Sequence, residues 1–186
     1  MIRREAYRLR PVMSGDLEML LTWRNAPHVR RWMFTTHLIS REEHQAWHEQ
    51  LQGSESTQVL IFECSGEPLG VVQFADIRRD LGCCSWGFYL AAAEPPRGTG
   101  TKLGVLALDY AFDGLDVRAL RAQVLIGNER SLAFHRKLGF REEEALVQRV
   151  LEDGRRENVK VLELLRDHWH RSKERVERSA FGKEGR

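Results

Sequence analysis

The middle of the chain carries three short apolar runs in close succession, at residues 58–64, 69–76 and 83–90. Turn residues separate the runs, as in the sequence Ser-Gly-Glu-Pro at residues 65–68, and runs of this kind indicate β-strands. Short connections favour pairing between consecutive strands, so the three should form an antiparallel meander. The chain therefore has to fold around a sheet.

Helical patterns and one strand precede this meander. Apolar spacing predicts a helix over residues 17–24, and residues 27–33, which begin with a proline, suit a second short helix. Ser40 and Glu43 form a capping box in front of a third helix. The alternating residues 7–10 predict an edge strand before these helices, so the opening third of the chain is mostly helical.

Helices and strands alternate after the meander. A glycine-containing turn at residues 97–102 opens an apolar helix, and a strand over residues 120–126 leads to another helix over residues 129–138. Asp153 and Gly154 mark the turn of a closing hairpin. This order predicts a mixed α/β domain of the α+β kind, with helices packed on a mostly antiparallel sheet.

The length of 186 residues suits one compact domain with its own core. We assign residues 1–168 to this domain. Residues 169–186 are mostly charged and contain two glycines, which predicts a flexible tail outside the domain. Glutamates within the tail dilute its positive charge and disfavour a basic contact arm.

The charge balance argues against two classes of partner. Lys and Arg total 29 against 27 Asp and Glu, and the formal net charge of +2 gives no strong field toward nucleic acid or an anionic membrane. The sequence also lacks an apolar run near the roughly 20 residues of a membrane span, and its first ten residues lack the apolar stretch of a signal peptide. We therefore expect a cytoplasmic protein.

The three cysteines, Cys64, Cys83 and Cys84, show no sign of a disulfide framework or a metal site. An odd number of cysteines suits reduced thiols, and their spacing is not that of zinc ligands. We expect them to be small buried core residues, and we expect no metal.

The turn at residues 97–102 reads Arg-Gly-Thr-Gly-Thr-Lys and stands directly before an apolar helix. Glycines let the backbone turn tightly, so that free amide groups and the positive end of the helix dipole converge on an anion. Arg97 and Lys102 can add charge to a pyrophosphate. The turn lacks the Gly-Lys-Ser/Thr ending of a nucleoside-triphosphate loop and the strand context of a dinucleotide fingerprint. An ordinary loop at a helix start is the alternative.

A second motif covers residues 128–140, with Asn128 as helix N-cap and Gly139 as left-handed C-cap. By itself it is a capped helix. Together and in this order, the two motifs resemble those of the GNAT acetyltransferase superfamily. This resemblance implies a mostly antiparallel central sheet of about seven strands flanked by helices. It also implies transfer of acetyl from acetyl-CoA, as co-substrate, to an amine.

The resemblance further implies where acetyl-CoA binds. In the superfamily the loop amides bind the pyrophosphate and the strand before the loop binds the pantetheine arm. The residues expected at the cofactor are Phe88, Tyr89, Leu90, Arg97, Gly98, Thr99, Gly100, Thr101, Lys102, Asn128 and Ser131. This sequence departs from the motif at Lys102, where the superfamily has a small residue.

A second departure is His135, which stands where the superfamily has a tyrosine that protonates the departing thiolate. We predict that His135 takes this catalytic role, as imidazolium or through a neutral N–H group. The alternative is a histidine of the pocket wall. No general base is evident, because Trp86 stands where many relatives have a carboxylate, and Asp76 is the runner-up. Otherwise a water chain removes the proton or the amine arrives deprotonated.

The acceptor should bind in the opening third. Its Trp-Arg-Asn, Trp-Met and Glu-Glu-His segments resemble the branch that acetylates the 4-amino group of a UDP-linked 4-amino-4,6-dideoxy sugar in pseudaminic acid biosynthesis. Aromatic and thioether groups suit a uracil, and arginines suit a diphosphate. The residues expected at the acceptor are Trp23, Arg24, Asn25, Arg30, Met33, His44, Trp47 and Trp86. Core packing is the alternative for the tryptophans.

Other readings stay open. Related enzymes acetylate a protein N-terminus, of the ribosomal-protein type, or an aminoglycoside, and the loss of the usual tyrosine and base keeps a non-catalytic acyl-CoA sensor open. Clustered arginines near the predicted entrance favour an anionic small molecule over a cationic drug. Edge strands also leave room for a homodimer.

Overall fold

In the computed structural model, which describes residues 3–182, these residues form a seven-stranded sheet of order β1-β2-β3-β4-β5-β7-β6. The strands are β1 (Tyr7–Pro11), β2 (Gln58–Cys64), β3 (Glu67–Arg78), β4 (Cys83–Leu90), β5 (Ala119–Leu125), β6 (Arg141–Val150) and β7 (Arg156–Leu165). The helices are α1 (Leu17–Asn25), α2 (Pro27–Arg30), α3 (Arg41–Leu51), α4 (Thr99–Asp109), α5 (Glu129–Leu138) and α6 (Arg166–Phe181), with a π turn over Tyr110–Gly114. The predicted mixed, mostly antiparallel architecture is confirmed.

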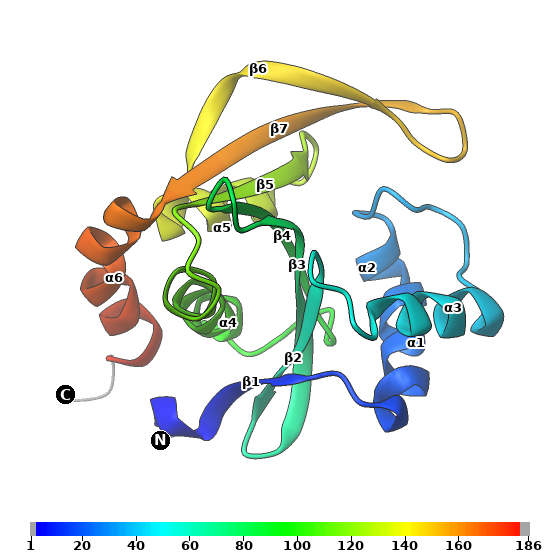
Figure 1. Cartoon of the computed structure of the whole chain (residues 1–186), viewed down its shortest axis with the longest axis horizontal. Helices are drawn as coiled ribbons and strands as arrows, with labels where there is room; N and C mark the ends of the chain where they lie inside the picture. The colour runs from blue at the N-terminus through cyan, green and yellow to red at the C-terminus, as the bar shows by residue number, and fades with distance from the viewer. Residues whose placement is uncertain (1–2, 183–186) are drawn as a thin grey trace.

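Helices cover both faces of the sheet (Figure 1), with α4 and α6 on one side and α1 to α3 on the other. The alternation along β2 shows why. Leu60 and Phe62 point into the larger core with α4, while Val59 and Ile61 point into a smaller core with α1 and α3. Successive side chains of a strand leave on opposite faces, so a fully apolar strand requires cover on both.

The sheet opens between β4 and β5. These two strands pair in parallel from Cys83 with Ala119 as far as Trp86 with Ala122. Beyond this point each strand continues on its other neighbour, since β4 pairs with β3 as far as Leu90 and β5 pairs with β7 through Leu125. The two strands therefore diverge, and an inner edge of the sheet lies beside the start of α4.

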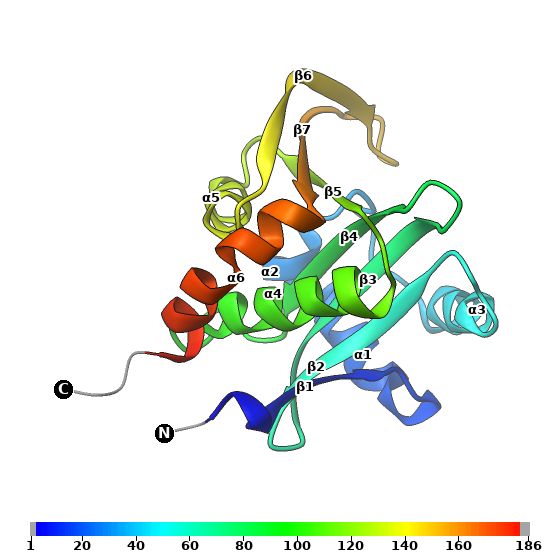
Figure 2. The same cartoon turned by 60° about the vertical axis from the view of Figure 1, so that its left-hand side comes forward.

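The C-terminal helix α6 corrects the prediction of a flexible tail from residue 169. Figure 2 shows α6 running alongside α4. Trp169 and Val176 are buried in the larger core, and the Trp169 indole N–H donates to the Asp109 carboxylate at 3.1 Å. Two apolar residues seven positions apart are enough for this docking, although charged residues surround them in sequence. The predicted tail residues 183–186 lie outside the described part of the chain.

The hairpin predicted at the end of the domain is present and long. β6 and β7 extend across the top of the molecule in Figure 1, and their connecting turn lies above α2. Contacts join this turn to the segment after α2, since the Thr36 hydroxyl donates to the Asp153 carboxylate at 3.3 Å. Two regions far apart in sequence thus meet on one side of the sheet.

The cysteines are free thiols, and Cys64 and Cys84 are buried as predicted, whereas Cys83 is half-buried. Burial raises the pKa of the Cys84 thiol to about 12. Across residues 3–182 no group of three or more His, Cys, Asp or Glu is arranged to hold a metal ion. None of the helices in this range is both long and apolar enough to span a membrane.

Candidate active site

The turn before α4 has the geometry of an anion cradle. Gly98 is the N-cap of α4 and has φ +87°, a left-handed conformation that suits glycine. Within the described residues, the amide N–H groups of Gly98, Gly100 and Thr101 have no acceptor, whereas Thr99 donates its N–H to the Pro96 carbonyl. Free amides at the positive end of a helix bind anions. The predicted phosphate loop therefore has the required backbone.

The lysine of this turn differs from its predicted role. Lys102 Nζ lies 2.9 Å from the Tyr7 hydroxyl and 4.7 Å from the centre of that ring, so its charge is directed toward β1. Instead, Lys137 on α5 donates to the Thr101 hydroxyl at 2.9 Å. Sequence reasoning missed Lys137, although it belongs to the second motif. Arg97 is exposed at the turn and forms no ion pair within residues 3–182.

A cavity of about 690 Å³ runs from the open edge between β4 and β5 toward α1 and α3. Of the predicted cofactor residues, Phe88, Tyr89, Asn128 and Ser131 line it. Leu90 packs on the larger core beside the loop, since a Cβ atom added at Gly100 would lie 3.9 Å from the Leu90 side chain. The loop thus lies beside the end of β4, whereas Leu90 and the loop residues 97–102 are not among the lining residues of the cavity.

His135 lies in the wall of this cavity and is buried, with 3% of its surface exposed. Its Nδ1–H donates to the Ser131 carbonyl at 2.8 Å, because a carbonyl oxygen can only accept. Burial lowers the pKa of His135 to about 4, so the ring is neutral at pH 7 and Nε2 carries a lone pair. This geometry argues against a standing imidazolium acid and makes Nε2 a proton acceptor.

Trp86 is a wall residue. It is 5% exposed and stacks at 5° on Phe140, with ring centres 5.6 Å apart, and its edge meets His135. Asp76, the other candidate for a base, is exposed at the cavity and has a left-handed φ of +50°. Unusual backbone conformations of non-glycine residues gather at functional sites. Asp76 therefore keeps its place as a candidate.

The structure sorts the predicted acceptor residues into two groups. Arg24, Met33, His44, Trp47 and Trp86 line the cavity, whereas Trp23, Asn25 and Arg30 are not among its lining residues. Trp23 packs in the smaller core. The Asn25 amide donates to the Ile39 carbonyl at 2.8 Å and accepts from the Ile39 N–H at 2.9 Å. Arg30 donates to the Thr36 carbonyl. Asn25 and Arg30 thus hold the loop before α3 in place, whereas Trp23 is a core residue.

The family profile of the acetyltransferase (GNAT) domain matches residues 7–141. The chain belongs to the GNAT acetyltransferases. It is 31% identical to the acetyltransferase PseH of Campylobacter jejuni over 129 residues, which are 68% of this chain and 78% of that protein. It is 26% identical to the spermidine N(1)-acetyltransferase of Escherichia coli over 152 residues, 82% of each protein.

Solved structures share the fold of this GNAT enzyme. The spermidine N-acetyltransferase of Vibrio cholerae, solved in complex with CoA and spermine, has a TM-score of 0.81 at 21% identity, covering 89% of this chain and 99% of that one. Family membership establishes an acetyl-CoA-dependent N-acetyltransferase, as the two motifs predicted. The acceptor is a separate question, because the named relatives differ in theirs.

Residues 32–39 of the loop before α3 and Glu152 of the hairpin turn cover the acceptor end of the cavity, and we call this cover the roof. His37 is 2.8 Å from both the Glu43 and the Glu152 carboxylates, on α3 and the hairpin turn respectively. Hydrogen bonds to these two carboxylates raise the pKa of His37 above its ordinary value. Hydrogen bonds from the Ser40 backbone N–H and from His37 lower the pKa of Glu43. The roof thus depends on exposed, titratable contacts.

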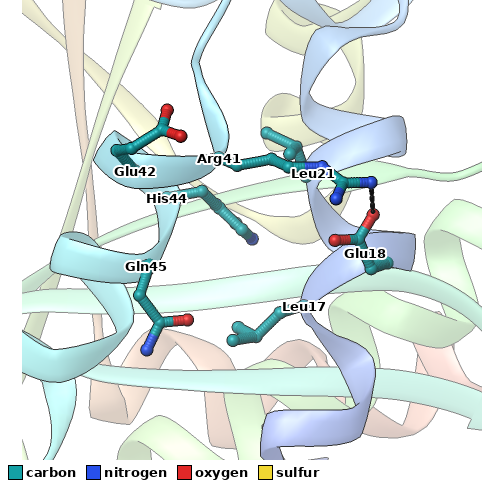
Figure 3. Close-up of a pocket in the computed structure, with 7 residues that line it drawn as sticks. All are labelled: Leu17, Glu18, Leu21, Arg41, Glu42, His44 and Gln45. Atoms are coloured by element: carbon teal, nitrogen blue, oxygen red, sulfur yellow. Dashed lines mark hydrogen bonds and ion pairs between the residues drawn. The ribbon is translucent and has the colours of Figure 1, made fainter.

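A second and smaller hollow of about 300 Å³ lies between α1 and α3 (Figure 3). An ion pair of 2.9 Å between Glu18 and Arg41 crosses it. His44 lines both hollows and stacks on Trp47 with ring centres 4.8 Å apart. Burial lowers the pKa of His44. His44 is therefore a neutral side chain that lies between the two hollows at the acceptor end.

Proposed function

We propose that the enzyme transfers acetyl from acetyl-CoA to the 4-amino group of a UDP-linked 4-amino-4,6-dideoxy sugar, as in pseudaminic acid biosynthesis. The observation that carries this proposal is the state of Arg24. Its guanidinium lines the cavity, it forms no ion pair with any described residue, and its Nη1 is buried without a hydrogen-bond partner. An unpaired arginine in a binding cavity calls for an anionic ligand.

Burial lowers the pKa of Arg24, but a guanidinium stays charged in proteins. A sugar nucleotide supplies a diphosphate to compensate this charge. A polyamine carries several positive charges and would be repelled. Of the three carboxylates that line the cavity, Glu43 and Glu152 are already bound to His37, and only Asp76 on β3 is left to attract it. The cavity therefore favours the acceptor of the first relative over that of the spermidine acetyltransferases.

The aromatic lining supports the same acceptor. Trp47 and Met33 line the cavity on the side of α3 and the roof, where a planar base can stack. The similarity to PseH, at 31% identity, supports the same acceptor weakly, since a spermidine acetyltransferase is 26% identical over a longer stretch. The amine to be acetylated would then lie toward His135, at the other end of the same cavity.

The mechanism follows from the positions of three groups. Free amides at Gly98, Gly100 and Thr101 hold the pyrophosphate, and the open edge of β4 orients the thioester. The amine nitrogen attacks the acetyl carbon and forms an N–C bond. His135 Nε2 then accepts a proton from that nitrogen and passes it to sulfur as the C–S bond breaks. One proton moves from nitrogen to sulfur, so a single neutral histidine serves as base and acid in turn.

A thiol-release assay with acetyl-CoA tests the proposal. The acceptors are the UDP-4-amino-4,6-dideoxy sugar, its epimers, spermidine, an aminoglycoside and a ribosomal-protein N-terminal peptide. We expect kcat/KM for the sugar nucleotide to exceed that for every non-nucleotide acceptor by at least about 100-fold. In the Arg24→Gln variant, the sugar-nucleotide KM should rise about tenfold while the acetyl-CoA KM stays constant. Preferential turnover of spermidine, or acetyl-CoA binding without turnover, would contradict the proposal.

A further inference from the structure

We infer that Arg149, on the hairpin strand β6, is the second cation of the acceptor site and holds the diphosphate together with Arg24. This inference rests on the proposed sugar-nucleotide acceptor. Arg149 was not among the residues predicted from sequence, because it lies 125 positions after Arg24 in a segment that reads as an ordinary hairpin. The structure places both guanidinium groups in the lining of the same cavity.

The two arginines meet consecutive residues of the roof. Arg24 Nη2 donates to the Thr35 carbonyl at 3.3 Å. The Arg149 guanidinium carbon lies 4.5 Å from the centre of the Phe34 ring. Phe34 and Thr35 are neighbours in the chain and both line the cavity, so the two cations approach one short segment from α1 and from β6.

Arg149 has carboxylates within reach but forms an ion pair with none of the described residues. Glu157 stands directly opposite it in the β6–β7 register, yet this glutamate pairs with Arg155 at 3.5 Å. Glu152 follows three positions later and is bound by His37. Glu157 and Glu152 are thus engaged by other residues, which leaves the charge of Arg149 available to a ligand.

Two unpaired cations beside one segment repel each other until an anion lies between them. A guanidinium offers a planar fork of donors that matches the oxygens of a phosphate, and one fork can serve each phosphate of a diphosphate. Phe34 supports the Arg149 guanidinium through a cation–π contact. A monophosphate needs only one of the two forks, so the pair selects for a diphosphate.

Titration calorimetry with UDP and UMP tests this inference. The wild-type enzyme should bind UDP more tightly than UMP, and Arg149→Gln should weaken UDP binding about tenfold and UMP binding far less. Arg149→Lys should recover part of the loss. The matched control is Arg156→Gln, which removes an arginine of the same hairpin that is not among the lining residues of the cavity. It should bind UDP as the wild type does.

Equal UDP affinity in the wild type and Arg149→Gln would overturn the inference, and so would an equal loss in Arg156→Gln. Acceptor kinetics separate it from the proposed function. Turnover of the UDP-sugar with an unchanged KM in Arg149→Gln would support the function and overturn the role of Arg149. Arg149-dependent UDP binding, with the UDP-4-amino sugar not acetylated, would support the diphosphate site and overturn the function.

Discussion

The two ends of the active-site cavity are built in different ways. At the proposed acetyl-CoA end, the binding groups belong to the backbone: a left-handed glycine, a helix start and a strand edge would present amide groups to the ligand. At the acceptor end, side chains from α1, α3, the roof loop and the hairpin meet across long distances in sequence. A backbone site tolerates changes of its side chains, whereas a side-chain site changes specificity with each of them.

The largest effect should be a loss of stability on changing α6, the helix that packs on α4 at the proposed acetyl-CoA end. Trp169 is fully buried between α6 and α4, so Trp169→Ala should lower the free energy of unfolding by about 3–5 kcal/mol. Urea unfolding followed by circular dichroism measures this loss. Arg171→Ala, on an exposed face of the same helix, is the control. A loss below about 1 kcal/mol for Trp169→Ala would show that α6 is not part of the core.

The next effect concerns the chemical step. His135→Phe keeps a ring in the cavity wall but removes Nε2, so kcat should fall about 100-fold while the acetyl-CoA Kd stays within a few-fold. Stopped-flow kinetics and calorimetry measure the two quantities. Because burial lowers the pKa of His135 to about 4, the wild-type rate should show no titration of this group between pH 6 and 8. Wild-type turnover in the variant would remove His135 from catalysis.

A smaller effect compares two lysines that flank the phosphate loop. Lys137 reaches Thr101 at the loop, whereas Lys102 is directed toward Tyr7. Lys137→Met should therefore raise the acetyl-CoA KM about threefold to tenfold, and Lys102→Met should leave it within about twofold. Initial-rate kinetics at fixed ionic strength measure both. If Lys102→Met raised the acetyl-CoA KM more than Lys137→Met did, the charge at the pyrophosphate would come from Lys102, as its sequence position suggested.

The smallest effect is the pH response of the roof. Because the carboxylates of Glu43 and Glu152 raise the pKa of His37 above about 6.5, closure of the roof is favoured at low pH and is lost as the pH rises through this raised pKa. The acceptor KM should thus be lower at pH 6 than at pH 8, by about twofold, since the contacts are exposed. His37→Gln should remove this dependence. A KM that falls with rising pH would contradict the arrangement.

The backbone geometry of the proposed acetyl-CoA end was predictable because its signals are local. Glycines at a helix start and an asparagine at a helix N-cap dictate backbone geometry within a few residues, and the cap is observed where Asn128 accepts the Ser131 N–H. The tautomer of His135 was not predictable, because it depends on a carbonyl and on burial that appear only after folding. The contact of Lys102 with Tyr7 was not predictable either, because Tyr7 lies on β1, 95 positions away in the sequence.

At the acceptor end, the types of residue were predictable from the sequence, but which of them face the cavity was not. Trp23, Arg24 and Asn25 in α1 were all expected at the acceptor, but a helix directs consecutive residues to different faces. Arg24 consequently faces the cavity, Trp23 faces the core and Asn25 faces the loop. Arg149 comes from the hairpin, and nothing in its local sequence distinguishes it from Arg156 on the partner strand. The two arginines are distinguished by their positions in the β6–β7 register and by the contact of Arg149 with Phe34.

The divergence of β4 and β5 also affects how this protein avoids self-association. A sheet edge with unpaired N–H and C=O groups is a template for other polypeptides, and proteins normally shield such edges. Here one such edge lies inside the molecule, in a cleft bounded by the adjoining strand and by α5. In the proposed function a pantetheine arm would bind along this inner edge, which β5 and α5 cover. The enzyme thus keeps backbone polarity for its ligand without offering it as an aggregation site.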